Sequence, residues 1–171
     1  MRVIAGQLRG RPIAVPAKGT RPTTDMVRGS IANSLVSLDA IDGARIADLY
    51  AGSGAMGIEL LSRGAAHCTF VERAPDAVRV IRANLTKLGL TDRATVLGAD
   101  ALGAVRTLGA LDLVVADPPY GFGGWDELLG AVRARLAVLE GDGAVDPPPG
   151  WRLTKHKAHG RTHVSFLTRV P

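Results

Sequence analysis

Apolar segments of strand length alternate with amphipathic segments of helix length over most of this chain, and this alternation restricts the possible folds more than any other feature. Strands are predicted at 45–50, 67–72, 94–98 and 111–116, and helices at 54–63, 76–88, 101–108 and 125–139. Strands that alternate with helices form a parallel sheet with helices on both faces. The fold class is therefore α/β, in a chain whose 171 residues suit one domain of ordinary size.

The two ends of the chain differ from this α/β centre. Residues 2–15 hold two short apolar-basic stretches around a turn, which predict a β-hairpin or an extended basic arm. We therefore divide the chain into a basic N-terminal arm at 1–20 and one α/β domain at 21–171. Residues 151–157 and 162–169 predict a C-terminal antiparallel hairpin at one edge of the sheet.

Basic residues are concentrated at these two ends. The formal net charge is +5, but residues 1–28 carry six Arg or Lys against one acid, and residues 151–171 carry five against none. The centre, 29–150, holds ten basic and fifteen acidic residues. Basic ends on an acidic centre suggest that a polyanion such as nucleic acid is bound, although a generic solvated surface would show the same excess.

The sequence lacks the features of membrane, secreted and metal-binding proteins. It has no run of about 18 apolar residues, so no membrane span is predicted. Its N-terminus lacks the apolar core of a signal peptide. Cys68 is the only cysteine, so we expect neither a disulfide nor a metal site, but a buried side chain. The expected location is the cytoplasm, and a monomer is the simplest expected state.

A glycine-rich loop follows the first predicted strand. Gly52, Gly54 and Gly57 match G-x-G-x-x-G, a pattern that lets a ligand approach the backbone at a helix N-terminus. Glu72, at the end of the next strand, can accept hydrogen bonds from both hydroxyls of a ribose. Asp48 could pair with an ammonium group, which S-adenosylmethionine has and NAD lacks. The candidate cofactor-binding residues here are Asp48, Tyr50, Ala51, Gly52, Ser53, Gly54, Glu72 and Arg73.

Asp100 and Ala101 follow the third predicted strand and could hold the edge of an adenine, with the carboxylate on its exocyclic amine. Asp is also a favoured residue at the start of a helix, so Asp100 could equally serve as a helix cap. The two roles can coexist, and both residues are candidate cofactor contacts.

Asp117-Pro-Pro-Tyr120 ends the fourth predicted strand, where open α/β sheets bind their ligands. The prolines fix φ and leave the Asp117 and Pro118 carbonyls without competing local donors. The exocyclic amine of a base is a poor nucleophile, because its lone pair is delocalised into the ring. Asp117, which would also border the cofactor, and the Pro118 carbonyl could hold its two hydrogens while Tyr120 stacks on a flipped base. The candidate catalytic residues for methylation of a base amine are Asp117, Pro118, Pro119 and Tyr120.

Together these motifs resemble those of Rossmann-like class I methyltransferases that use S-adenosylmethionine. More closely, the chain resembles the RsmD-type 16S ribosomal RNA guanine-N2 methyltransferases. Arg21-Pro-Thr-Thr-Asp25 is the more discriminating element of this resemblance. The similarity is carried by residues 2–11, 21–25, 27–28, 48–54, 60–64, 72 and 117–120.

The resemblance implies an enzyme that methylates the N2 amine of a guanine in 16S rRNA, within the small ribosomal subunit or its assembly intermediate. It also implies that Thr23 and Thr24, either of which can cap the helix that follows, lie near the cofactor. The N-terminal hairpin would contact RNA. The candidate RNA-binding residues are Arg2, Arg9, Arg11, Arg21 and Arg28.

The chain departs from the family pattern in two places. Met26, Gly29 and Ala32 replace a basic residue, a glutamate and an aromatic residue, which alters the helix expected to support RNA docking. Residues 140–150 are short and rich in Gly and Pro, and Pro147–Pro149 cannot donate ladder hydrogen bonds. We therefore expect a stunted fifth strand, or a sequence from which residues are absent at this place.

Other functions fit part of the pattern. An adenine-N6 methyltransferase acting on RNA or DNA would use Asp117-Pro-Pro-Tyr120 equally well, but no DNA-recognition domain is visible. An NAD-dependent oxidoreductase fits the glycine spacing but gives Asp48 no role. A glycine-rich turn that binds no ligand would leave the position of Glu72 unexplained. A non-catalytic RNA-binding assembly factor would keep the pocket but not the turnover.

Overall fold

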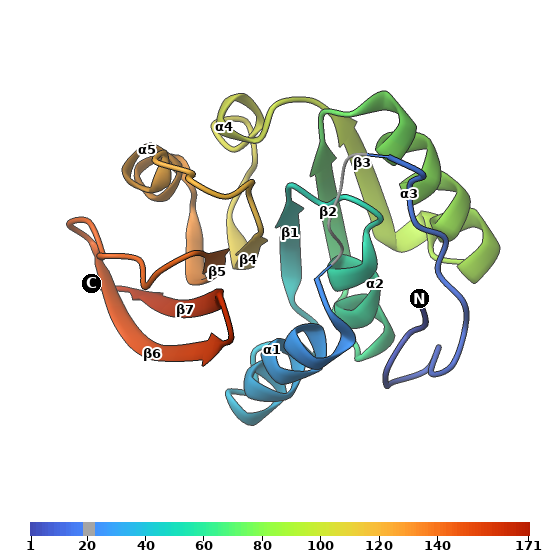
Figure 1. Ribbon diagram of the computed structural model, residues 1–171, viewed down its shortest axis with the longest axis horizontal. Helices are drawn as coiled ribbons and strands as arrows, with labels where there is room; N and C mark the ends of the chain where they lie inside the picture. Colours follow the sequence, from blue (N-terminus) through green and yellow to red (C-terminus); the bar gives the residue numbers. More distant parts are fainter. Residues whose placement is uncertain (19–22) are drawn as a thin grey trace.

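The computed structural model describes residues 1–18 and 23–171, which form a seven-stranded sheet with helices on both faces (Figure 1). The spatial order of the strands is β3-β2-β1-β4-β5-β7-β6. The first five in this order are parallel, and β7 pairs antiparallel with both β5 and β6. The elements are α1 (Asp25–Ser37), β1 (Arg45–Leu49), α2 (Ala55–Ser62), β2 (His67–Glu72), α3 (Pro75–Leu88), the 3-10 helix η1 (Thr91–Arg93), β3 (Ala94–Gly98), α4 (Ala101–Ala104), β4 (Leu111–Ala116), α5 (Trp125–Ala131), β5 (Ala134–Gly141), β6 (Trp151–His159) and β7 (Thr162–Arg169). The predicted α/β class and the C-terminal hairpin are confirmed.

Two apolar layers cover the sheet, one on each face. The first includes α1, α2 and α3, whose residues Ile31, Ile58 and Ile81 are almost fully buried. The second includes α4 and α5, which pack through residues such as Leu128. Cys68 is buried in the first layer, as expected. Within the described part of the chain, no helix is long and apolar enough to cross a membrane.

Residues 125–139 are predicted as one helix, and this prediction is wrong. α5 ends at Ala131 and β5 begins at Ala134. The Ala, Leu, Arg and Glu residues of this segment favour helix by themselves, but β5 pairs with β4 on one side and β7 on the other, and its residues 137–140 are buried. Burial in the sheet therefore outweighs the small differences in intrinsic propensity. The prediction of a stunted fifth strand is also wrong. β5 has eight residues and ends before the prolines.

Two smaller differences concern α4 and the N-terminal arm. α4 ends at Ala104 rather than at residue 108. The arm folds back on itself, but among the described residues its ladder pairing is one isolated antiparallel bridge, between Arg2 and Pro12. Val3 and Ile13 of the arm are buried in the same core as α1, α2 and α3. The arm is thus a hairpin-like turn packed on the body of the protein rather than a pair of regular strands.

Candidate active site

β1 and β4 lie side by side in the sheet (Figure 1). A large cavity lies at the carboxyl ends of these strands. From β1 the chain passes outward to β2 and β3, and it then returns to β4 on the other side of β1. Open α/β sheets bind ligands at such a switch point, outside the carboxyl ends of the strands. The cavity has a volume of about 500 Å³. Its lining includes Thr23, Thr24, Asp48, Tyr50, Ala51, Gly52, Ser53, Glu72, Arg73, Asp100, Ala101, Asp117, Pro118, Pro119 and Tyr120, so that Gly54 is the one candidate cofactor or catalytic residue outside it.

The turn after β1 has the backbone conformation of a ligand-binding loop. Tyr50, Gly52 and Gly54 have φ values of 59°, 58° and 82°, which are strained for tyrosine and accessible to glycine. Glu72 lies beside this turn, as predicted. Its two carboxylate oxygens accept hydrogen bonds from the amides of Gly52 (2.8 Å) and Ala74 (3.0 Å). Each oxygen keeps a second lone pair for a ligand hydroxyl.

Asp48 is buried beneath the glycine-rich turn, with a relative exposure of 4%. Its Oδ2 accepts a hydrogen bond of 2.9 Å from the amide of Gly57, in the first turn of α2. Burial raises the pKa of Asp48 to about 8, with the charges of Asp117 and Glu72 adding to this and the Gly57 hydrogen bond opposing it. Because a carboxylate loses its hydration in such a place, it is suited to receive a cationic group of a ligand.

Asp100 occupies the N-cap of α4, where its Oδ2 accepts a hydrogen bond of 3.1 Å from the amide of Gly103. The predicted capping role is therefore confirmed. Asp100 and Ala101 also line the cavity, so the cap leaves the carboxylate beside the ligand space.

Asp117 directly follows β4, and its amide donates a hydrogen bond of 3.4 Å to the Leu49 carbonyl of β1. The Thr23 hydroxyl donates a hydrogen bond of 2.8 Å to Oδ2 of Asp117. Although Asp117 lies at the mouth of the cavity, the loss of surrounding water raises the pKa of its carboxyl, and the Thr23 hydrogen bond opposes this. Pro118 is buried beside it, whereas Tyr120 is 59% exposed at the rim.

Glu140, near the end of β5, lines the same cavity but is absent from the residues predicted from sequence. It is 6% exposed, and its burial, followed by the charges of Asp117 and Asp48, raises the pKa of Glu140 to about 9. The sequence prediction misses Glu140 because it assigns residues 125–139 to a helix, so that Glu140 is not recognised as lying near the end of a strand. One signal is available all the same, since Glu140 ends an apolar run much as Asp117 follows one. Among the described residues, no cluster of His, Cys, Asp or Glu could hold a metal ion.

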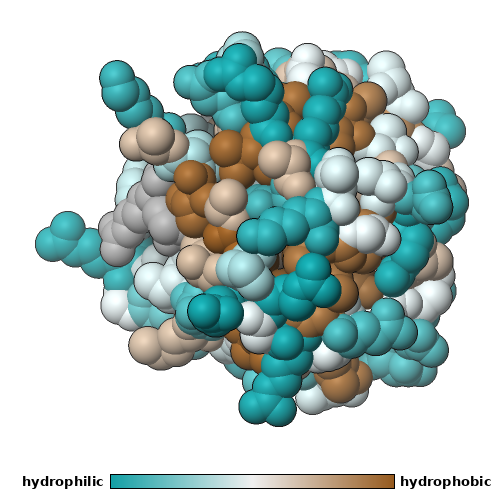
Figure 2. Space-filling view, turned by 90° about the vertical axis from the view of Figure 1, so that its right-hand side faces the viewer, coloured by the Kyte–Doolittle hydropathy of each residue, from teal (hydrophilic) through white to brown (hydrophobic). Residues whose placement is uncertain are grey.

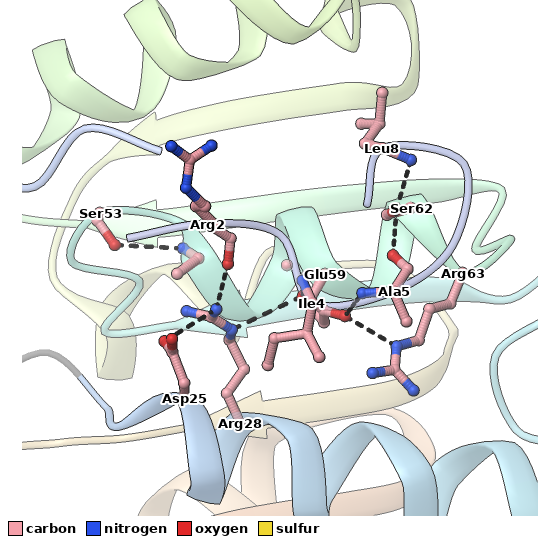
Figure 3. Close-up of polar contacts among 12 residues, drawn as sticks. Arg2, Ile4, Ala5, Leu8, Asp25, Arg28, Ser53, Glu59, Ser62 and Arg63 are labelled. Carbon is pink, nitrogen blue, oxygen red and sulfur yellow. Dashed lines mark hydrogen bonds and ion pairs between the residues drawn. The ribbon is translucent and has the colours of Figure 1, made fainter. Parts of the chain in front are cut away.

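Arg28 does not reach the surface, so its predicted contact with RNA is wrong. Its side chain is 1% exposed, and burial lowers the pKa of its guanidinium. Nη2 donates 2.6 Å to the Arg2 carbonyl and lies 3.2 Å from Asp25, while Nε lies 3.7 Å from Glu59 (Figure 3). Glu59 also accepts hydrogen bonds from two amides of the arm. This buried charge network attaches the arm to α1 and α2, a role that sequence pattern alone does not indicate.

The other candidate RNA contacts lie on or next to the arm. Arg2, Arg9 and Arg11 are exposed, although Arg2 and Arg11 also donate to the carbonyls of Gly10 and Lys87. Arg21 lies outside the described residues. Figure 2 shows the side of the molecule on which α3 and the arm lie in Figure 1, where hydrophilic side chains project between apolar ones. This side therefore mixes hydrophilic and apolar side chains, unlike the apolar faces of the sheet.

The parallel sheet, the glycine-rich turn after β1, the acid ending β2 and the Asp-Pro-Pro-Tyr loop after β4 together define a Rossmann-like methyltransferase. The solved structure of the Escherichia coli protein yhhF is similar to this one, with a TM-score of 0.87 and 33% identity over 99% of this chain and 97% of that chain. The family model described as Conserved hypothetical protein 95 matches residues 1–168. This chain belongs to that family.

Two relatives show how far the similarity extends. Ribosomal RNA small subunit methyltransferase D of Escherichia coli (strain K12) is 34% identical over an alignment of 185 positions. This alignment covers 99% of this chain and 90% of the relative. YlbH of Bacillus subtilis (strain 168) is 44% identical over 125 residues, which cover 70% of this chain and 67% of the relative. The first match covers almost the whole chain, so the relationship includes the N-terminal arm as well as the catalytic motifs.

Proposed function

We propose that this protein transfers a methyl group from S-adenosylmethionine to the N2 amine of a guanine in 16S rRNA, in the small ribosomal subunit or its assembly intermediate. The observation that carries this proposal is the convergence of Asp48, Glu72 and Asp117 on one cavity. The name of the Escherichia coli relative supports ribosomal RNA as the substrate. The choice of guanine N2 rests on the resemblance of the sequence motifs to the RsmD type.

The residues that line the cavity fit S-adenosylmethionine. Glu72 has the free lone pairs to accept hydrogen bonds from both ribose hydroxyls. Asp100 and Ala101 lie where they could hold the adenine edge, and Asp48 offers a desolvated carboxylate to the ammonium group. NAD, which carries phosphates and no ammonium group, would instead bring negative charge toward these acids.

Catalysis would depend mainly on position and charge. When bound, S-adenosylmethionine supplies a methyl group on a positively charged sulfur. Asp117 and the Pro118 carbonyl would each accept a hydrogen bond from the target amine. These two bonds would direct the lone pair of the amine nitrogen at the methyl carbon of S-adenosylmethionine. The bound cofactor would supply this methyl group and keep the electron pair of the broken S–C bond on its sulfur, as the neutral thioether S-adenosylhomocysteine. The Asp117 carboxylate stabilises the positive charge that grows on nitrogen and then takes the proton that nitrogen loses.

The test is methyl transfer from radiolabelled S-adenosylmethionine to small ribosomal subunits from cells that lack the enzyme, followed by digestion to nucleosides. We expect label in N2-methylguanosine. Asp117→Ala should lower this transfer by about 100-fold or more, because it removes a group that acts in the transition state. Calorimetry with S-adenosylhomocysteine should show that this variant still binds the cofactor product.

Three results would contradict the proposal in different ways. Label in N6-methyladenosine would keep the mechanism and replace the base. Full activity of Asp117→Ala would remove Asp117 from catalysis. Binding of NADH with no binding of S-adenosylhomocysteine would replace the cofactor and with it the class of reaction.

A further inference from the structure

Each parallel strand brings one carboxylate to the cavity near its carboxyl end. In the spatial order of the sheet these are Asp100 after β3, Glu72 on β2, Asp48 on β1, Asp117 after β4 and Glu140 on β5. In the proposed function the first three take the adenine, the ribose and the ammonium group, and Asp117 takes the target amine. The order therefore runs from the cofactor to the substrate, and Glu140 lies at the substrate end of the row.

Glu140 has acceptor capacity that the described residues do not use. Both of its carboxylate oxygens lie 3.5 Å from the Thr23 hydroxyl, at the limit of a hydrogen bond. That hydroxyl has one hydrogen and lies 2.8 Å from Asp117, so it donates to Asp117. Among the described residues, no other donor is within hydrogen-bond distance of Glu140. Its side chain is only 6% exposed, and it lines the cavity. A buried carboxylate in this condition lacks hydrogen bonds that a ligand can supply.

The register of the sheet places Glu140 next to the catalytic loop. Ala116 of β4 pairs with Leu139 of β5, so that Asp117 and Glu140 follow paired residues on adjacent parallel strands. Neighbouring strands are about 4.8 Å apart, a separation that one planar base can bridge with two adjacent polar groups of its edge. A base whose amine is held by Asp117 would therefore present the next atom of its ring edge to Glu140.

We propose that Glu140 selects guanine, by accepting a hydrogen bond from N1–H of the base whose N2 amine is held by Asp117 and the Pro118 carbonyl. This inference rests on the proposed function and adds the group that reads the base. The Watson–Crick edge of guanine offers donors at both N1 and N2, which a carboxylate accepts. The positive charge of bound S-adenosylmethionine favours the ionised form of Glu140. Adenine has an acceptor at N1 beside its amine, so an ionised carboxylate would repel it.

The variant Glu140→Gln tests this inference, because an amide can donate a hydrogen bond to adenine N1, which an ionised carboxylate cannot do. The target nucleotide is first mapped with the wild-type enzyme, and subunits are then prepared with guanine or adenine at that position. We expect Glu140→Gln to lower formation of N2-methylguanosine by about 100-fold. On the adenine subunits it should form more N6-methyladenosine than the wild type does, which reverses or strongly reduces the preference for guanine.

Two controls separate base selection from a general defect. Binding of S-adenosylhomocysteine by Glu140→Gln should stay within about threefold of the wild type, since the row of acids places Glu140 beyond the cofactor. Glu127→Gln makes the same chemical change on an exposed residue of α5 that pairs with Arg106, and it should alter neither rate.

The inference is overturned if Glu140→Gln methylates guanine at the wild-type rate, or if it loses activity on guanine and adenine subunits in the same proportion. A large loss of cofactor binding would also overturn it and place Glu140 beside Asp48 at the ammonium group. These outcomes differ from failure of the proposed function, in which the wild-type enzyme itself would form no N2-methylguanosine.

Discussion

Three of the five carboxylates that line the cavity, Asp48, Asp117 and Glu140, bear most on what kind of ligand it accepts. Burial is the largest cause that raises the pKa of Asp48, Asp117 and Glu140 alike. None of the three forms an ion pair with a described residue. A cationic ligand lowers the pKa of such groups and favours their ionised forms. The site is thus matched to a cationic ligand, as the proposed S-adenosylmethionine would be.

Cofactor binding should therefore release protons. Asp48 has a pKa of about 8 in the protein alone, so at pH 7 most molecules hold a proton there. Pairing with an ammonium group lowers that pKa, and the proton leaves. We expect calorimetry at pH 7 in two buffers of different ionisation heat to show proton release when S-adenosylmethionine binds. Affinity should rise with pH up to about 8 and then level off, because above that pH Asp48 is already ionised before the cofactor binds.

Asp48→Asn isolates the contribution of this residue. The amide keeps an acceptor oxygen for the Gly57 N–H but cannot titrate or attract a cation. This variant should bind the cofactor more weakly and release fewer protons than the wild type. Equal proton release by both proteins would assign the release to Glu140 or Asp117 instead.

At the scale of elements, close packing between α2 and β2 sets the position of the glycine-rich turn. A Cβ at Gly57 would overlap the Phe70 ring and lie 2.8 Å from Sγ of Cys68. Both of those side chains are fully buried in the core, so they have little room to move. The amide that holds Asp48 is thereby fixed against the sheet, which links helix packing to the ligand site.

Gly57→Ala should destabilise the protein by about 1–3 kcal/mol, the usual cost of overpacking a core. The measurement is the free energy of unfolding in urea. Gly130→Ala in α5 is the matched control, because a Cβ there meets no atom within 4 Å and the helical residue gains in propensity. If both variants have the same stability as the wild type, close approach of α2 to β2 is not required.

On the scale of the whole molecule, we expect the distribution of charge to govern the encounter with RNA. The chain has a formal net charge of +5, with its acids concentrated in the centre and at the cavity. Arg9 and Arg11 of the arm are exposed, whereas Arg28 is used to hold the arm in place. Basic groups that neutralise phosphates release counterions, so their contribution depends on salt.

Replacing Arg9 and Arg11 together with alanine should weaken binding to small ribosomal subunits and make it less sensitive to salt. The slope of log affinity against log salt should become shallower by roughly 0.7–0.9 for each phosphate that the arm no longer neutralises. Fluorescence anisotropy over a range of salt concentrations measures this slope. Arg106→Ala, an exposed change on the face covered by α4 and α5, is the control. Equal slopes for the arm variant and the wild type would exclude the arm from binding phosphates.

The sequence by itself determined the order of most elements, because hydrophobic periodicity and glycine punctuation are local signals. Those signals also indicated the turn after β1, Glu72 and the Asp117 loop, since each motif is contiguous or lies at a strand end. Only the tertiary structure decided that residues 134–141 form a strand, because pairing with β4 and β7 outweighs the helical propensity of that segment. The same pairing brings Glu140 next to Asp117, and packing of the arm on α2 buries Arg28. Contacts between residues distant in sequence decide such roles, and no local pattern contains them.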